Sequence, residues 1–166
     1  MHPERVEKCF NDIMSNLKLH YLDLLLVHWP IPLKENSPPF KGSPTEELFF
    51  EKETQLIDTW KAMESLVKKG KVKSIGCCNL SVKKLKELLG HPQLSIKPAV
   101  VQNEMNPYLS MQHLVDFCKK EGIVTTAYAP LGWNNRSKLL DDPLEIYCYL
   151  LQYFSLLYLV KFFLLS

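Results

Sequence analysis

The chain has 166 residues, of which 46% are hydrophobic and 23% are charged, a composition typical of one globular domain with a sizeable core. Lys and Arg number 20 against 18 Asp and Glu, so the net charge of +2 gives no reason to expect nucleic acid or anionic lipid as a partner. The five cysteines contain no C-x-x-C pair, which favours reduced thiols over disulfides or a metal site. Residues 1–12 lack the apolar stretch of a signal peptide, so we expect a cytoplasmic protein.

Helical and extended patterns alternate along most of the chain. Apolar residues recur at helical spacing over 3–19, and 23–27 is a short Leu-dominated run typical of a strand buried on both faces. Several prolines between 31 and 44 predict a long loop. The later expected elements are a helix at 51–69, a strand at 72–76, a helix at 82–89, a strand at 99–104, a helix at 111–121 and a strand at 123–128. Strands alternating with helices in this way predict a parallel sheet with right-handed crossovers.

Four residues mark expected helix boundaries. Ser81 and Ser110 precede helical patterns and are good N-cap residues, because a serine hydroxyl accepts a hydrogen bond from a free backbone N–H. Gly70 and Gly122 follow helical patterns and are expected to end them, because glycine adopts the left-handed conformation common at helix ends.

The last part of the chain, 143–166, differs in character and is rich in Leu, Tyr and Phe. Its nearly uncharged run, 146–160, spans only about 15 residues, fewer than the roughly 18 that indicate a membrane span. We therefore expect a buried tail, while association of this tail with a membrane surface remains the less favoured alternative.

Polar and aromatic side chains gather where the expected strands end. They are His28 and Trp29, Cys78 and Asn79, Gln102 and Glu104, and Tyr128. Each has an ordinary structural explanation: a hydrogen-bonded histidine, a turn-forming asparagine, a glutamine whose amide needs a partner, or a packed tyrosine. Their common position at one edge of a parallel sheet, where such folds place their chemistry, instead favours a binding or catalytic site.

Four segments together carry a family resemblance: YLDLLLVHWP, TWKAMESLVKKGKVKSIGCCNLS, KPAVVQNEMNPYL and EGIVTTAYAPLG. In this order they resemble the aldo-keto reductase superfamily, whose members are single-domain (β/α)8 barrels that reduce aldehydes and ketones with NADPH. The resemblance covers 1–142 and corresponds to the middle of the barrel. It implies an α/β fold, a partial TIM barrel of about four parallel strands with flanking helices, followed by a divergent apolar tail at 143–166.

The resemblance also implies roles for residues that would contact the substrate and the nicotinamide ring. His28 matches the histidine that hydrogen-bonds the substrate carbonyl and orients it for hydride attack. Trp29 matches a wall of the substrate pocket. Tyr128 matches the aromatic residue that stacks on the nicotinamide.

Three further positions correspond to the site of the nicotinamide carboxamide. Asn79 and Gln102 match the pair that holds this group. Cys78 stands where serine is usual, so one hydrogen bond to the carboxamide region is expected to be weakened or lost. NADPH is therefore the implied cofactor and a small carbonyl compound the implied substrate; no metal is implied.

Other family features have no counterpart in the chain. The tyrosine that acts as the acid, its lysine and aspartate neighbours, and the segment that binds the adenosine 2′-phosphate belong to other parts of the barrel. We do not expect Tyr108 or Tyr128 to replace that tyrosine, because neither has a visible lysine partner. Two hypotheses follow: an NADPH-dependent carbonyl reductase, or a truncated, inactive isoform that acts through binding partners. With only four strands, unpaired sheet edges would also permit self-association.

Overall fold

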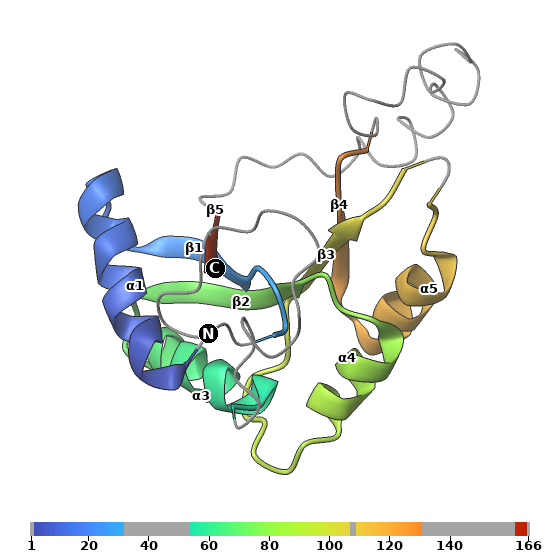
Figure 1. Ribbon diagram of the computed structural model, residues 1–166, viewed down its shortest axis with the longest axis horizontal. Helices are drawn as coiled ribbons and strands as arrows, with labels where there is room; N and C mark the ends of the chain where they lie inside the picture. The colour runs from blue at the N-terminus through green and yellow to red at the C-terminus, as the bar shows by residue number, and fades with distance from the viewer. Residues whose placement is uncertain (1, 32–53, 107–108, 131–161, 166) are drawn as a thin grey trace, which may run out of the picture.

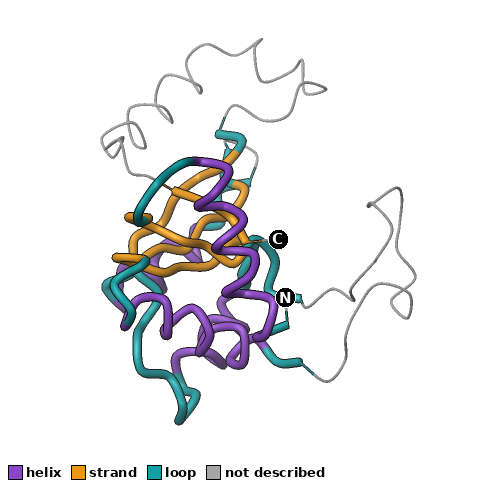
Figure 2. The backbone as a smooth tube through the Cα atoms, turned by 90° about the vertical axis from the view of Figure 1, so that its left-hand side faces the viewer, coloured by secondary structure: helices purple, strands orange, loops and turns teal. Residues whose placement is uncertain are grey.

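The computed structural model describes residues 2–31, 54–106 and 109–130, together with the backbone of 162–165. These residues form one twisted sheet with helices packed outside it, as Figure 1 and the side view in Figure 2 show. The elements are α1 (Pro3–Leu17), β1 (Leu22–Val27), α3 (Leu56–Lys68), β2 (Val72–Cys78), α4 (Val82–Leu89), β3 (Val100–Glu104), α5 (Gln112–Glu121), β4 (Val124–Tyr128) and β5 (Phe162–Leu165). The proline-rich stretch at 32–53 and most of the tail lie outside the described residues.

The sheet has the strand order β4-β3-β2-β1-β5, and every neighbouring pair is parallel. The expected alternation of strands and helices is therefore confirmed. Cys78 pairs with Gln102, and Glu104 pairs with Tyr128, so the carboxyl ends of β2, β3 and β4 lie at one edge. This register decides which side chains can meet there.

One edge of the sheet differs from the expectation of four strands with unpaired outer edges. The backbone of β5 pairs with β1, from Leu24 beside Phe162 to Val27 beside Leu165. The expectation is wrong for this edge because the free N–H and C=O groups of β1 find partners in a segment of the tail that is far away in sequence. Figure 1 shows β5 crossing beside β1.

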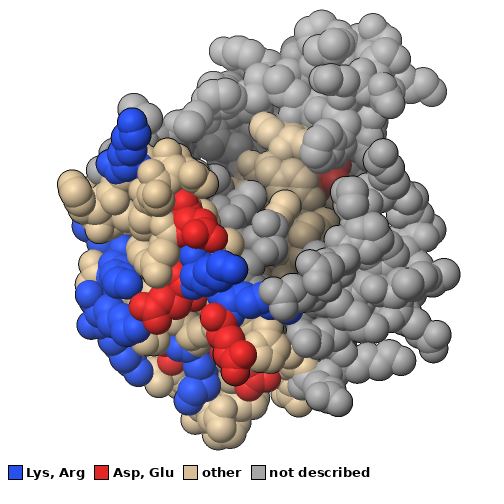
Figure 3. Space-filling view, turned by 60° about the vertical axis from the view of Figure 1, so that its left-hand side comes forward, with Lys and Arg blue, Asp and Glu red and all other residues tan. Residues whose placement is uncertain are grey.

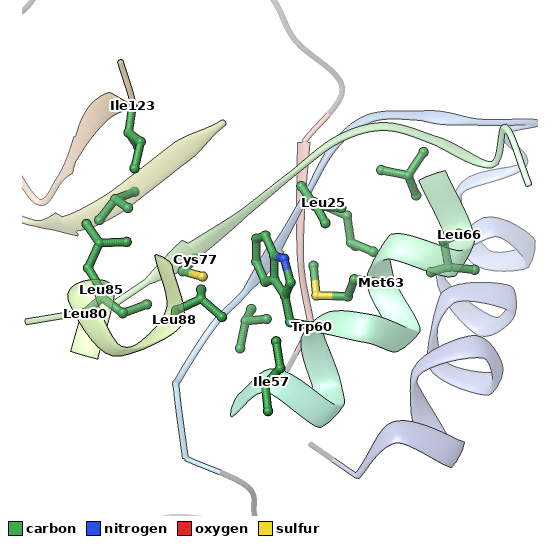
Figure 4. Packing of buried hydrophobic residues seen from close by; sticks show 14 of the residues in the cluster. Leu25, Ile57, Trp60, Met63, Leu66, Cys77, Leu80, Leu85, Leu88 and Ile123 are labelled. Carbon is green, nitrogen blue, oxygen red and sulfur yellow. The ribbon is translucent and has the colours of Figure 1, made fainter. Parts of the chain in front are cut away.

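The main hydrophobic core lies between the sheet and the helices (Figure 4). Trp60 of α3 is completely buried, and its indole N–H donates to the carbonyl oxygen of Ile96 at 2.8 Å. Leu25 and Cys77 belong to this core, whereas Leu26 belongs to a second, smaller cluster. Because neighbouring residues of a strand point to opposite faces, the smaller cluster lies on the face of the sheet away from the main core.

Element boundaries agree with the sequence where local signals set them. The predicted helix at 82–89 is confirmed, with the Ser81 hydroxyl accepting from the backbone N–H of Lys84 at 3.3 Å. The predicted Ser110 cap is wrong: the N-cap of α5 is Met111, in a left-handed conformation with φ of 48°. The predicted start of α3 at 51 is also wrong, because a capping box between Gln55 and Asp58 begins this helix at Leu56.

The surface of the helical layer carries basic and acidic side chains side by side (Figure 3). Lys69 and Lys71 both contact Glu7, at 3.0 and 3.2 Å, and Lys73 contacts Asp23 at 2.8 Å. None of the described helices combines the length and apolar character needed to cross a membrane. No group of three or more potential metal ligands occurs among the described residues.

Candidate functional site

The site residues expected from the sequence follow neighbouring strands of the sheet. His28 comes directly after β1, Asn79 directly after β2, Gln102 lies within β3 and Tyr128 is the last residue of β4. Because the four strands are parallel, these residues meet at the carboxyl edge of the sheet.

Asn79 is the centre of a hydrogen-bond network at this edge. Its side-chain amide nitrogen donates to the His28 carbonyl oxygen at 2.8 Å, and its Oδ1 accepts from the Tyr128 hydroxyl at 2.8 Å. Its backbone N–H donates to the Gln102 carbonyl oxygen at 3.0 Å. Asn79 thus links the ends of β1 and β4, and Gln102 within β3, to its own strand.

These bonds fix the orientation of the Asn79 amide. The His28 carbonyl can only accept, so the amide nitrogen must face it and the amide oxygen must face Tyr128. An amide group has two N–H donors and two acceptor lone pairs. The second N–H and the second lone pair of Asn79 have no partner among the described residues, so they could serve a ligand. The chain turns at Asn79, directly after β2, and we call this the Asn79 turn. Asn79 has a left-handed backbone conformation there, with φ of 56°, which asparagine tolerates better than most residues.

Tyr128 remains a hydrogen-bond donor over the neutral pH range. Burial raises its pKa above the ordinary value, and the nearby Glu104 carboxylate and Cys78 add to the effect. A raised pKa suits the bond to Asn79, because that bond needs the protonated phenol. It also makes Tyr128 a poor proton donor in catalysis near neutral pH. Tyr108 lies outside the described residues.

Cys78 and Gln102 face each other on paired positions of β2 and β3. The Cys78 thiol donates to Gln102 Oε1 with a sulfur–oxygen distance of 3.9 Å. Burial raises the pKa of Cys78 to about 12, so this sulfur stays a neutral thiol and a weak donor. The contact directs the Gln102 carbonyl oxygen toward Cys78 and leaves the amide nitrogen on the other side.

The Gln102 amide nitrogen is a second polar group of the site that could bind a ligand. Gln102 is only 8% exposed, and this nitrogen has no hydrogen-bond partner among the residues that the structure describes. A buried donor without a partner costs about 1–3 kcal/mol, so an acceptor supplied by a ligand would be favoured there. Together with the free groups of Asn79, this donor suits a ligand with a carboxamide.

His28 and Trp29 lie at the outer part of the site. Their ring centroids are 6.1 Å apart with the ring planes tilted by 42°. Trp29 is 51% exposed, so most of its face is open to solvent or to a ligand. His28 joins the network through its backbone carbonyl, and its imidazole makes no hydrogen bond to the residues that the structure describes.

Comparison with known proteins gives the relationship of this chain. Residues 1–142 match the family model described as the Aldo/keto reductase family. The chain belongs to the aldo/keto reductase family. It is 41% identical over 143 residues to Aldo-keto reductase family 1 member A1 of Gallus gallus, which covers 86% of this chain and 43% of that protein. The Homo sapiens protein of the same name is 37% identical over 152 residues, covering 87% of this chain and 46% of the relative.

A solved structure supports the same family and fold. The aldose reductase from Giardia lamblia has a TM-score of 0.70 and 39% identity, covering 80% of this chain and 43% of that chain. The predicted fold class, a partial barrel of parallel strands with flanking helices, is therefore confirmed. This aldo/keto reductase chain spans less than half the length of the relatives that it matches.

One polar residue beside the site escapes prediction from the sequence. Asn103 is 6% exposed, and its side chain makes two hydrogen bonds to the backbone of Leu80. The available signal is a second amide residue next to Gln102 within an expected buried strand. Both residues of this pair are buried within β3, so both amides need hydrogen-bond partners.

Proposed function

We propose that this chain carries the nicotinamide-binding and carbonyl-orienting part of an oxidoreductase that uses NADPH to reduce aldehydes and ketones to alcohols. The network that joins His28, Asn79 and Tyr128 is the observation that supports it, because it fixes the orientation of the Asn79 amide at the carboxyl edge of the sheet. Membership of the aldo/keto reductase family supports the reaction class. The substrate class is a small carbonyl compound.

The described residues fit the cofactor's nicotinamide through hydrogen-bond chemistry. The free amide N–H groups of Gln102 and Asn79 would donate to the carboxamide oxygen, and the free lone pair of Asn79 would accept from the carboxamide NH₂. The Tyr128 ring would cover one face of the nicotinamide. When bound, the cofactor supplies a hydride to the carbonyl carbon.

His28 would orient the substrate in this proposal. A neutral or charged imidazole can donate an N–H to the carbonyl oxygen, which holds the carbon toward the hydride and stabilises developing negative charge. Trp29, exposed beside His28, would form an apolar wall for the carbonyl compound. Both roles come from the resemblance and agree with the position of the two side chains after β1.

The proton for the alcohol must come from another group. Tyr128 is unsuited, because its pKa lies above the ordinary value and its hydroxyl is already donated to Asn79. The family resemblance assigns this step to a tyrosine beside a lysine and an aspartate. We propose that this acid lies outside the described residues.

Location and assembly complete the proposal. Cys9, Cys77, Cys78 and Cys118 are free thiols, which agrees with a reducing, cytoplasmic location. Among the described strands β4 lies at an edge of the sheet, and Val124 on it is 48% exposed. Self-association through this edge is therefore part of the proposal.

Titration of the chain with NADPH tests the proposed function. Nicotinamide emission should increase and saturate for the unaltered chain, and Asn79→Gly should weaken the affinity about tenfold or more. Glycine suits this substitution because it accepts the left-handed φ of 56° while it removes the side chain that carries the amide. Gln102→Leu should act in the same direction.

A matched control separates the site from general effects of amide loss. Gln112→Leu removes an exposed glutamine of α5 that bonds Asp116, and it should leave the affinity unchanged. A folded chain that binds no NADPH, or that binds equally well after Asn79→Gly, would show the proposal to be wrong.

A further inference from the structure

Asn103 makes an unusual pair of contacts for a side chain in the middle of a sheet. Its Oδ1 accepts from the backbone N–H of Leu80 at 3.1 Å, and its amide nitrogen donates to the carbonyl oxygen of Leu80 at 3.0 Å. Asn103 is 6% exposed and Leu80 1% exposed, so neither bond is replaced by water. The side chain thus supplies what a neighbouring strand would supply to Leu80 if β2 continued.

Leu80 is the residue that follows Asn79, so these bonds act on the Asn79 turn. The Leu80 N–H belongs to the peptide group that joins Asn79 to Leu80, and holding it fixes the rotation on the carboxyl side of Asn79. The N–H on the other side of Asn79 is held by the Gln102 carbonyl at 3.0 Å. Consecutive residues of β3 therefore hold both peptide groups that flank Asn79.

The direction of the Asn79 side chain depends on both peptide groups. A left-handed residue between two fixed peptide planes has little freedom of φ or ψ, so its Cα–Cβ bond points in one direction. Without the bond to Asn103, the peptide after Asn79 could rotate. The amide of Asn79 would then spend part of its time away from His28 and Tyr128.

We propose that Asn103 is a positioning residue, which holds the Asn79 turn so that the Asn79 amide faces the carboxamide of a bound nicotinamide ring. The ligand named here rests on the function proposed above. Asn103 itself touches no ligand and acts through Leu80. Adjacent side chains of β3 then have different roles: Gln102 contacts the ligand, and Asn103 holds the Asn79 turn.

Glu64 provides a matched comparison, because it is a buried polar side chain with a similar contact pattern elsewhere. It is 2% exposed, and one carboxylate oxygen accepts from the backbone N–H groups of Ser95 and Ile96, both at 2.8 Å. These residues precede β3, at the end of the strand opposite to the candidate site. Loss of Glu64 should therefore lower stability without moving Asn79.

Two measurements on Asn103→Leu and Glu64→Leu test the inference. The first is the rate of hydrogen exchange at the Leu80 amide without ligand, corrected for each variant's change in global stability. This rate should become about tenfold faster or more in Asn103→Leu and stay unchanged in Glu64→Leu. The second is the affinity ratio between NADP⁺ and its 3-acetylpyridine analogue, in which a methyl ketone replaces the carboxamide. The unaltered chain should prefer the carboxamide, and only Asn103→Leu should lose about tenfold of this preference.

The affinity ratio of the two nucleotides reports the position of the Asn79 amide, because a partly unfolded chain loses affinity for both nucleotides equally. If Asn103→Leu does not fold, Asn103→Asp keeps the acceptor for Leu80 N–H and removes the donor, and it should show a smaller change in the same direction. Unchanged exchange at Leu80, or an unchanged ratio in a chain that binds, would overturn the inference. An unaltered chain that binds neither nucleotide would overturn the proposed function and the assigned ligand, while Leu80 exchange would still decide whether Asn103 holds the turn.

Discussion

The Tyr128 hydroxyl donates to Asn79 Oδ1 at 2.8 Å and so connects the ends of two strands that are not neighbours in the sheet. Tyr128 ends β4 and Asn79 follows β2, with β3 between them. From within β3, the Gln102 carbonyl oxygen accepts a hydrogen bond from the Asn79 backbone N–H. The candidate site is therefore held by contacts across three strands, which gives its amide groups fixed directions before any ligand binds.

The substitution Tyr128→Phe should distinguish the contribution of the Tyr128 hydroxyl to cofactor binding from that of the aromatic ring. Phenylalanine keeps an aromatic face for a nicotinamide, but it removes the bond that orients Asn79. A net hydrogen bond contributes about 1 kcal/mol, so NADPH affinity should fall about fivefold to tenfold in a fluorescence titration. The control is Tyr21→Phe, which keeps the ring that lies 4.4 Å from Lys73 Nζ, away from the candidate site. Equal affinities of Tyr128→Phe and the unaltered chain would contradict a role for the hydroxyl.

Alkaline pH should destabilise the folded chain through its buried thiols. Burial raises the pKa of Cys78 to about 12 and that of Cys118 to about 11, from an ordinary value of 9.0. Above pH 9 the unfolded thiols lose protons while the folded ones keep them, so the free energy of unfolding falls as pH rises. Each such thiol adds a slope of up to about 1.4 kcal/mol per pH unit.

Urea denaturation between about pH 8 and pH 10.5 measures this slope. Burial also raises the pKa of Cys77, so Cys118→Ala removes one of several such thiols and should give a shallower decline. Its stability at neutral pH is lower because of the lost packing. Identical slopes for Cys118→Ala and the unaltered chain would show that this thiol does not retain its proton in the folded state.

Gly76→Ala should disturb the contact between β1, β2 and β3. A Cβ at this position would lie 2.4 Å from the Val100 carbonyl oxygen and 2.6 Å from Leu26 Cδ2. Overpacking of this kind costs about 1–3 kcal/mol or more, because the backbone of β3 has to move. Urea denaturation should show the loss, whereas Gly90→Ala, with its nearest contact at 3.3 Å, should change stability by less than about 1 kcal/mol. A Gly76→Ala chain of unaltered stability would mean that β2 and β3 lie farther apart.

Removal of residues 162–166 should expose the outer edge of β1. The backbone of β5 pairs with four consecutive positions of that strand, from Leu24 to Val27. Loss of several backbone hydrogen bonds should lower the free energy of unfolding by at least about 2 kcal/mol and increase self-association in sedimentation velocity. Removal of residue 166 alone is the control and should change neither. A shortened chain that keeps its stability and its monomer fraction would show that β5 does not protect the edge.

Local sequence signals predicted most of the elements because their causes are local. Ser81 caps α4 through the nearby Lys84 N–H, and Gly122 ends α5 with φ of 71°. The prediction fails at Ser110 because Met111, in a left-handed conformation and without a side-chain cap, is the N-cap of α5. Propensity alone would not select methionine for that conformation.

Hydrophobic periodicity and turn residues act over a few positions, so the sequence alone predicted the order of the elements up to β4. It also placed His28, Asn79, Gln102 and Tyr128 within or directly after strands. The hydrogen bonds between Asn103 and Leu80 and the pairing of β5 with β1 arise from packing between distant segments, so the sequence alone did not predict them. These partners are 23 residues apart in the first case and more than a hundred in the second, and no local pattern specifies which distant backbone groups will remain without a partner. The packed sheet creates those unsatisfied groups, and side chains or distant segments then satisfy them.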